Sequence, residues 1–175
     1  MAEHDAAVVS FVDVTNDIMA AIKDGLTGAY SQTYYKTGLK ERVIAEAERT
    51  KNKYLGIVGI DLKGFKNVND ERSHAAGDTI LKDLVKILKS AVRKIDYVIR
   101  DGGDEFLILC PGADERVIGR IMHQIYGRTN AYNAKVSDLL LNINPYVVGV
   151  AGKSNYEDLF MSIGEKINAQ KRSSK

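Results

Sequence analysis

Residues 54–61, YLGIVGID, are apolar at both odd and even positions, and this segment restricts the fold more than any other part of the chain. A strand that is apolar on both faces is buried on both faces, so it must occupy a central place in a sheet. Gly56 and Gly59 predict close approach of neighbouring backbone. The segment ends at Asp61, whose charge at such depth requires a partner or a cation.

Hydrophobic periodicity on both sides of this strand predicts an alternation of helices and further strands. Helices are expected at residues 39–51, 76–93, 113–132 and 156–170, and strands at 97–100, 105–110 and 146–151, the last opened by Pro145. The Asp-Gly and Gly-Gly pairs of residues 101–104 predict a tight hairpin turn with positive φ. The order β-α-β-β-α-β predicts an α+β, ferredoxin-like antiparallel sheet with helices on one face.

Composition excludes several classes of protein. The chain has 175 residues and a formal charge of +2, which predicts neither nucleic-acid nor anionic-membrane binding. The single cysteine, Cys110, cannot form an internal disulfide, and its apolar surroundings predict a core position. No apolar run reaches the roughly 18 residues of a membrane span, and no export signal is present, so we expect a cytoplasmic protein without a membrane segment.

Acidic and glycine residues gather at predicted strand ends. Asp61 ends the central strand, residues 102–105 place Asp104 and Glu105 beside two glycines at a hairpin tip, and residues 64–70 add a lysine and amides. Carboxylates on adjacent strands, without His or Cys, suit Mg²⁺ or Mn²⁺ carried by a nucleotide, which is the chemistry of nucleotidyl transfer. A solvated turn also collects Asp and Gly, and that structural interpretation stays open.

Four motifs, in order, resemble the GGDEF family of bacterial diguanylate cyclases. Residues 102–106 read GGDEF, residues 24–28 read DGLTG, residues 61–70 read DLKGFKNVND, and residues 73–78 read SHAAGD. This resemblance implies a palm-type, nucleotidyl cyclase-like version of the fold. It also implies an enzyme that condenses two GTP into cyclic di-GMP and two pyrophosphates.

The resemblance assigns a metal site and a catalytic group. It implies that Asp61, Asp104 and the Leu62 carbonyl bind Mg²⁺ or Mn²⁺, with Glu105 close by. Asp104 would help to remove the proton of the ribose 3′-hydroxyl. Lys66 would place positive charge where negative charge grows in the transition state, although a lone lysine is more often a solvated surface charge.

The remaining implied roles concern the nucleotide. Backbone amides near Gly64 and Phe65 would hold the triphosphate with Lys66, and Gly102 and Gly103 would let the backbone approach it.

A second set of residues would read the base. Asn69 and Asp78 would recognise guanine, because a carboxylate accepts from guanine groups that adenine lacks, which favours GTP. His74 is equally compatible with a substrate-site and a structural role.

Arg93 and Asp96 occupy the register of the family's R-x-x-D inhibitory site. The arginine fork suits a guanine edge or a phosphate, so we expect cyclic di-GMP to bind here and inhibit the enzyme. The alternative is an ion pair at a helix end.

The sequence departs from the family pattern at its periphery. Lys63 replaces the second Asp of D-x-D, Ser73 replaces a glycine, and Ala29, Gln32 and Thr33 replace the usual residues after L-T-G. The terminal helix motif is reduced to residues 164–167, with Lys171 or Arg172 as its candidate phosphate-binding cation. We expect lower turnover or weaker GTP binding if that helix is poorly formed.

The chain is expected to divide into residues 1–23, a linker, and residues 24–175, the GGDEF domain. Residues 8–15 resemble the closing strand and exit of a PAS sensor, and residues 11–22 carry a short amphipathic stripe. An upstream sensor domain is therefore expected, the alternative being an unrelated strand extension.

Closing the ring of cyclic di-GMP requires two GTP-bound subunits, so catalysis implies a homodimer. The rival hypotheses are a silent domain that binds GTP or cyclic di-GMP as a receptor, and a scaffold that only dimerises.

Overall fold

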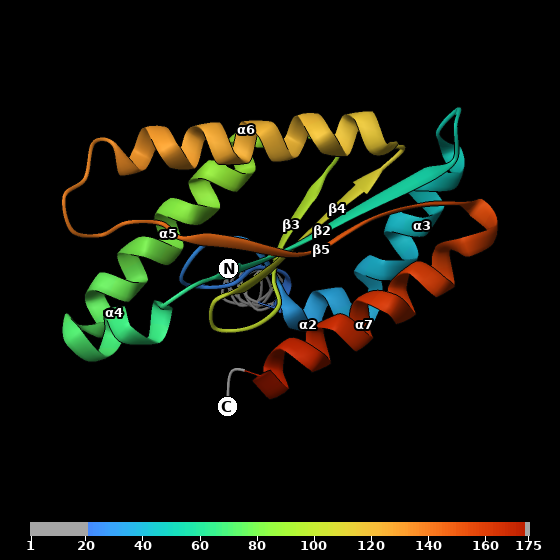
Figure 1. Cartoon of the computed structure of the whole chain (residues 1–175). Helices are drawn as coiled ribbons and strands as arrows, with labels where there is room; N and C mark the ends of the chain where they lie inside the picture. Colours follow the sequence, from blue (N-terminus) through green and yellow to red (C-terminus); the bar gives the residue numbers. More distant parts are fainter. Residues whose placement is uncertain (1–20, 174–175) are drawn as a thin grey trace, which may run out of the picture.

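The computed structural model describes residues 21–173, with a five-stranded sheet at its centre (Figure 1). The strand order is β1-β3-β4-β2-β5, so β2 lies inside the sheet, as its sequence predicts. All neighbouring strands pair antiparallel except β1 and β3, which are parallel. The strands are β1 (Tyr30–Ser31), β2 (Tyr54–Leu62), β3 (Tyr97–Arg100), β4 (Glu105–Pro111) and β5 (Ile143–Gly152).

Most helices form where apolar periodicity predicts them. The helices are α2 (Gln32–Tyr34), the π-helix η1 (Tyr35–Leu39), α3 (Lys40–Arg49), α4 (Phe65–Glu71), α5 (His74–Ala91), α6 (Glu115–Asn133), the 3₁₀-helix η2 (Lys153–Asn155) and α7 (Tyr156–Ser173). Side-chain caps help to set three of their starts: Ser31 Oγ accepts from Tyr34 N, Ser73 Oγ accepts from Ala76 N, and Asp114 Oδ1 accepts from Val117 N. The departure Ser73 therefore serves as the N-cap of α5.

Both faces of the sheet carry a hydrophobic core. Even-numbered residues of β2 and β4 pack with α5 and α6, whereas odd-numbered residues pack with α3 and α7. Figure 1 shows these two helix pairs on opposite sides of the sheet. The α+β architecture is confirmed, and the two helices of the β-α-β-β-α-β order do share one face. The helices outside that core order, α3 and α7, cover the opposite face, because the alternating side chains of the central strands leave a second apolar surface to bury.

Three local expectations need correction. Pro145 lies inside β5 and pairs with Ile60 beside a register shift, which is tolerated because β5 is an edge strand. The space at Gly56 is taken by the Ile118 side chain of α6, which a Cβ would meet at 2.5 Å, rather than by backbone. Among the described residues, the glycines with positive φ are Gly28, Gly64 and Gly112, so residues 101–104 do not form a primed turn.

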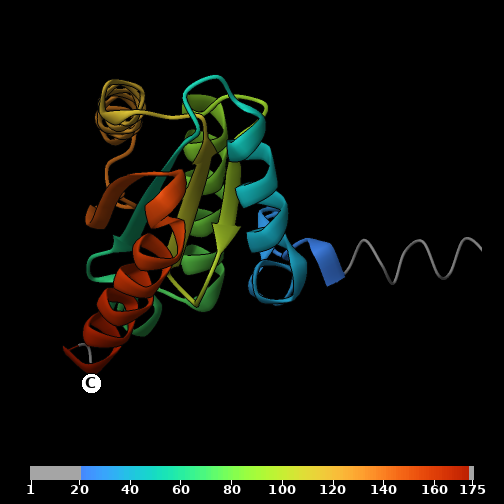
Figure 2. The same ribbon diagram turned by 90° about the vertical axis from the view of Figure 1, so that its right-hand side faces the viewer.

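Residues 1–20 lie outside the described part of the chain, and with them the PAS-like strand and nearly all of the predicted amphipathic stripe. Figure 2 shows the first described residues (blue) beside the sheet edge that β1 forms, away from β5. Cys110 is fully buried in β4, as predicted. Within residues 21–173, no helix combines the length and the apolar character needed to cross a bilayer.

Candidate active site

Pairing of β2 with β4 brings the predicted acidic residues together at one end of the sheet. Asp61 is directly opposite Glu105, and the Leu62 N–H donates to the Asp104 carbonyl oxygen at 3.3 Å. Residues opposite each other on antiparallel strands point to the same face, so the carboxylates of Asp61 and Glu105 share one face. Glu105 is buried, and Asp61 is half-buried.

Asp104 lies in the loop that precedes β4. Burial raises the pKa of its carboxyl group, while a backbone hydrogen bond and the charge of Arg100 act in the opposite direction. A partly desolvated carboxylate of this kind gains from a nearby cation, because the cation compensates for the lost hydration.

The acidic end of β2 and β4 offers oxygen ligands of the kind that a divalent cation requires. Among the described residues, no three His, Cys, Asp or Glu side chains gather closely enough to hold a metal by themselves. Mg²⁺ commonly binds through one or two carboxylates and takes its other ligands from substrate phosphates and water. The opposed Asp61 and Glu105, with Asp104 and the Leu62 carbonyl adjacent, fit this second arrangement.

Arg100 anchors the loop that carries Asp104. Its guanidinium donates to the Gly103 carbonyl oxygen at 3.2 and 2.7 Å and to both Asp24 carboxylate oxygens at 3.2 Å. Asp24 also accepts from the Thr27 amide and hydroxyl at 2.8 and 2.6 Å. Burial opposes ionisation of Asp24, but these hydrogen bonds and the charge of Arg100 outweigh it and lower the pKa. Sequence reasoning missed Arg100, although a cation immediately before an acidic, glycine-rich turn was a usable signal.

Glycine at position 102 leaves room for an acidic side chain. A Cβ on Gly102 would lie 2.7 Å from Glu105 Oε2, so any larger residue would displace the carboxylate. Asp101 N and Gly102 N donate to the Glu105 carbonyl oxygen at 2.9 and 3.3 Å, which closes the loop. Gly103 has open space at its Cβ position, as a residue beside a ligand requires.

The predicted guanine-reading residues lie beside the start of α5. Gly64, at φ +74°, turns the chain from β2 into α4, a helix that the sequence analysis did not predict. Asn69 of α4 lies over Gly77 of α5, where a Cβ would meet the Asn69 Oδ1 atom at 2.1 Å. Asp78 follows Gly77 directly on α5, so its backbone lies one residue from the position that the Asn69 amide covers.

Three other predicted residues surround this place. The Phe65 side chain packs against the core between the sheet, α5 and α6, so it has a structural role. Only its backbone amide is then a candidate for the predicted substrate contact. Lys66 and His74 are exposed. An exposed His74 is not the buried, backbone-bonded histidine of the structural alternative.

Comparison with known proteins identifies this arrangement. The family model described as "Diguanylate cyclase, GGDEF domain" matches residues 21–175, which is most of the chain. The chain belongs to the GGDEF family. Among curated relatives, diguanylate cyclase DgcS of Shewanella oneidensis is 37% identical over 114 residues, covering 65% of this chain and 38% of its own length. Diguanylate cyclase DosC of Escherichia coli is 33% identical over 152 residues, covering 85% of this chain and 33% of its own.

Solved structures show the same GGDEF fold. The coiled coil and GGDEF domain of DgcB from Caulobacter crescentus, in complex with c-di-GMP, matches with a TM-score of 0.76 at 18% identity, over 98% of this chain and 92% of that one. Diguanylate cyclase SiaD of Pseudomonas aeruginosa, in complex with its activator SiaC, matches with a TM-score of 0.65 at 26% identity, over 97% of this chain and 66% of that one. This GGDEF chain spans about a third of the length of the curated relatives named above.

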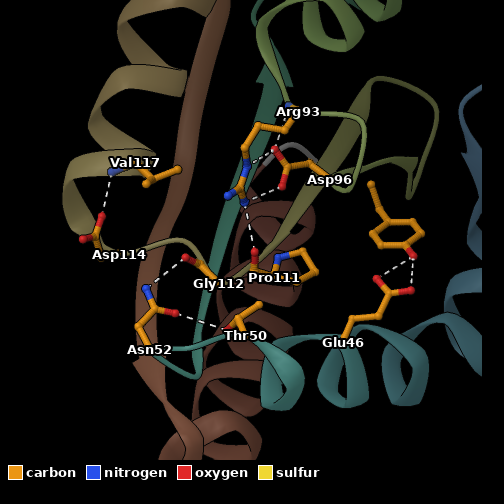
Figure 3. Close-up of polar contacts among 10 residues, drawn as sticks. Glu46, Thr50, Asn52, Arg93, Asp96, Pro111, Gly112, Asp114 and Val117 are labelled. Atoms are coloured by element: carbon orange, nitrogen blue, oxygen red, sulfur yellow. Dashed lines mark hydrogen bonds and ion pairs between the residues drawn. The ribbon is translucent and has the colours of Figure 1, made fainter.

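The R-x-x-D pair of this GGDEF domain forms a closed ion pair (Figure 3). Arg93 Nη2 donates to Asp96 Oδ1 at 2.7 Å and to the Pro111 carbonyl oxygen at 3.0 Å, and Arg93 Nε donates to Asp96 Oδ2 at 3.1 Å. The Asp96 side chain is 0% exposed, whereas that of Arg93 is 38% exposed. The pair therefore braces the loop between α5 and β3, as the structural alternative predicts, and still presents part of the guanidinium.

A cavity of about 320 Å³ lies beside Arg93, lined also by Arg120 and Gln124 of α6. Sequence reasoning missed Arg120, because nothing in a helical repeat marks which residue faces a distant loop. Two arginines on one cavity suit an anion such as a phosphodiester.

The eroded C-terminal motif still forms a helix. α7 buries Tyr156, Phe160 and Ile163 against the α3 face, so the helix predicted at residues 156–170 is confirmed. Its apolar spacing is sufficient without the motif residues. The side chains of Lys171 and Arg172 lie outside the described part of the structure.

Proposed function

We propose that this GGDEF domain is a diguanylate cyclase that converts two GTP into cyclic di-GMP and two pyrophosphates. The observation that carries the proposal is the register of β2 and β4, which places Asp61 opposite Glu105 and beside Asp104. The Asn69–Asp78 place at the start of α5 is joined to that strand end through α4.

Each group has a defined part in this reaction. Asp61, Glu105, Asp104 and the Leu62 carbonyl would hold Mg²⁺ or Mn²⁺, which lowers the pKa of the attacking hydroxyl and neutralises pyrophosphate. Asp104 would accept the proton of the ribose 3′-hydroxyl. Lys66 would neutralise the triphosphate from its exposed position.

Residues of α4 and α5 would select the base. Asp78 would accept from the N1–H and the exocyclic amine of guanine, and Asn69 would complete the contact. ATP offers neither donor at these positions, so it would leave a carboxylate unpaired, which costs about 1–3 kcal/mol.

Three parts of the proposal concern assembly. Two chains would face each other, because one GTP cannot close the ring alone. Residues 24–175 would form the catalytic domain, and residues 1–23 would link it to an upstream sensor. Cyclic di-GMP would inhibit by binding Arg93 and Asp96, with Arg120 on the same cavity.

Chromatography of the products formed from GTP and Mg²⁺ tests the proposal. We expect cyclic di-GMP from the natural chain, a rate per chain that rises with protein concentration, and no product from Asp104→Ala. Asp158→Ala, an exposed carboxylate of α7, is the matched control and keeps its activity. Nucleotide binding without product at high protein concentration would instead establish the receptor, and absence of both would leave the scaffold.

A further inference from the structure

Gln32, one of the residues that depart from the family pattern after L-T-G, touches the acidic loop from the start of α2. Its Nε2 donates to the Asp101 carbonyl oxygen and lies 3.4 Å from Asp101 Oδ1. Asp101 is the residue directly before Gly102, so Gln32 holds the first residue of the loop that carries Asp104. Arg100 holds the same loop at Gly103.

The position of Gln32 follows from short-range structure. β1 pairs in parallel with β3, with Tyr30 opposite Ile99 and Ser31 opposite Arg100. Continuing this register by one residue brings Gln32 to Asp101. Ser31 Oγ also accepts from Tyr34 N and caps α2, which starts at Gln32. The side chain of Gln32 is therefore aimed by a strand pairing on one side and by a helix start on the other.

Asp101 is an unusual residue for a loop, because it is only 4% exposed. Buried carboxylates need hydrogen-bond donors, and Gln32 supplies one. Tyr35, the first residue of the π-helix η1, lies within the electrostatic influence of the same carboxylate. Burial, and to a smaller extent the charge of Asp101, raises the pKa of Tyr35 to about 12. The segment of residues 32–35 thus packs directly against the start of the loop.

We propose that Gln32 is a positioning residue, which holds the loop of residues 101–104 in the geometry that GTP and its cation require. The inference deepens the proposed cyclase function and rests on it. Gln32 lies eight residues after Asp24, the residue that Arg100 ties to Gly103. Asp24, through Arg100, and Gln32 therefore hold the loop at both of its ends.

Three substitutions separate hydrogen-bond donation from mere space filling. Gln32→Glu keeps the size of the side chain but removes its N–H donor, so the new carboxylate faces the Asp101 carbonyl oxygen and carboxylate. Gln32→Ala removes the contact. Gln32→Arg again offers N–H donors to the carbonyl oxygen and to the carboxylate of Asp101. Thr33→Ala, at the exposed neighbouring position, is the matched control.

Activity and loop order are measured on the full chain. We expect kcat/KM for GTP to fall about tenfold in Gln32→Glu and about fivefold in Gln32→Ala, from the loss of one or two hydrogen bonds. Gln32→Arg and Thr33→Ala should stay within twofold. The Mg²⁺ concentration needed for half-maximal activity should rise in Gln32→Glu, a change that a purely structural role would not cause.

Amide hydrogen exchange supplies a readout that needs no catalysis. Protection of the Asp101 and Gly102 amides, which bond the Glu105 carbonyl, should fall in Gln32→Glu. The Gly112 amide, bonded to the Tyr54 carbonyl at the far end of the same strand pair, should not change. Unchanged protection at the loop would overturn the positioning role even if no variant makes cyclic di-GMP. A natural chain without product would overturn only the cyclase proposal, and equal losses in Gln32→Glu and Gln32→Arg would overturn the need for a donor.

Discussion

Gly77 lies where α4 crosses the start of α5. The Asn69 amide fills the space that a side chain at position 77 would take. A Cβ at this position would be 2.1 Å from Asn69 Oδ1, 3.1 Å from Asn69 Cγ and 3.2 Å from Phe65 Cζ. The first separation is far below any real contact, so Gly77→Ala must displace the Asn69 amide. The Phe65 ring needs to move by only a few tenths of an ångström.

The two effects of Gly77→Ala on stability oppose each other. Alanine gains about 1 kcal/mol of helix propensity over glycine in a helix interior. Displacing one half-buried amide and shifting Phe65 costs a similar amount, about 1 kcal/mol. The free energy of unfolding should therefore change little, while Asn69 would lose the guanine contact that we propose for it. Loss of one hydrogen bond worth about 1.4 kcal/mol raises KM for GTP about tenfold.

The assay is steady-state formation of cyclic di-GMP as a function of GTP concentration, beside urea unfolding of each variant. Gly119→Ala and Gly127→Ala are controls, because both glycines lie on exposed positions of α6 with nothing within 4 Å of their Cβ sites. They should gain about 1 kcal/mol of stability and keep KM. Because the effect acts through Asn69, the pair Gly77→Ala/Asn69→Ala should be no worse than Asn69→Ala. An unchanged KM in Gly77→Ala would refute the assignment of Asn69 to guanine, and additive losses in the pair would refute an effect that acts through Asn69.

Three further substitutions test other parts of the site. Because burial raises the pKa of Asp104, its ionised form destabilises the fold at neutral pH. Asp104→Asn should therefore raise the melting temperature at pH 7 in metal-free buffer, with the gain vanishing below the ordinary value of 3.8, and a gain confined to acid pH would contradict this. Arg93→Ala leaves the buried Asp96 carboxylate without its cation, so it should lower the free energy of unfolding by about 2 kcal/mol, discounted for the part-exposed arginine. It should also weaken cyclic di-GMP binding in isothermal titration, and unchanged affinity would refute the inhibitory site. Gly102→Ala should reduce product formation while the chain stays folded, because its Cβ would meet Glu105 Oε2 at 2.7 Å.

Local pattern alone was sufficient for much of the fold. Apolar residues at both odd and even positions predicted that β2 is central in the sheet. The apolar stripe of α5 predicted a helix that buries Ile80, Leu84 and Leu88. The GGDEF motif marked residues 102–106, and the expected place of the hairpin beside the central strand predicted the antiparallel pairing of β2 with β4. These inferences succeed because each depends on periodicity or on contacts between segments that are adjacent in the sheet order.

Other features depended on contacts that no local pattern records. The position of Pro145 inside β5 is possible only because that strand lies at the sheet edge. Arg100 reaches Asp24 across 76 residues of sequence, and Gln32 reaches Asp101 across 69. Which donor meets which acceptor was decided by strand register, in particular the two-residue pairing of β1 with β3, and register is set by the packing of the whole sheet. The sequence thus marked the candidate residues of the site, and the tertiary structure decided what holds them in place.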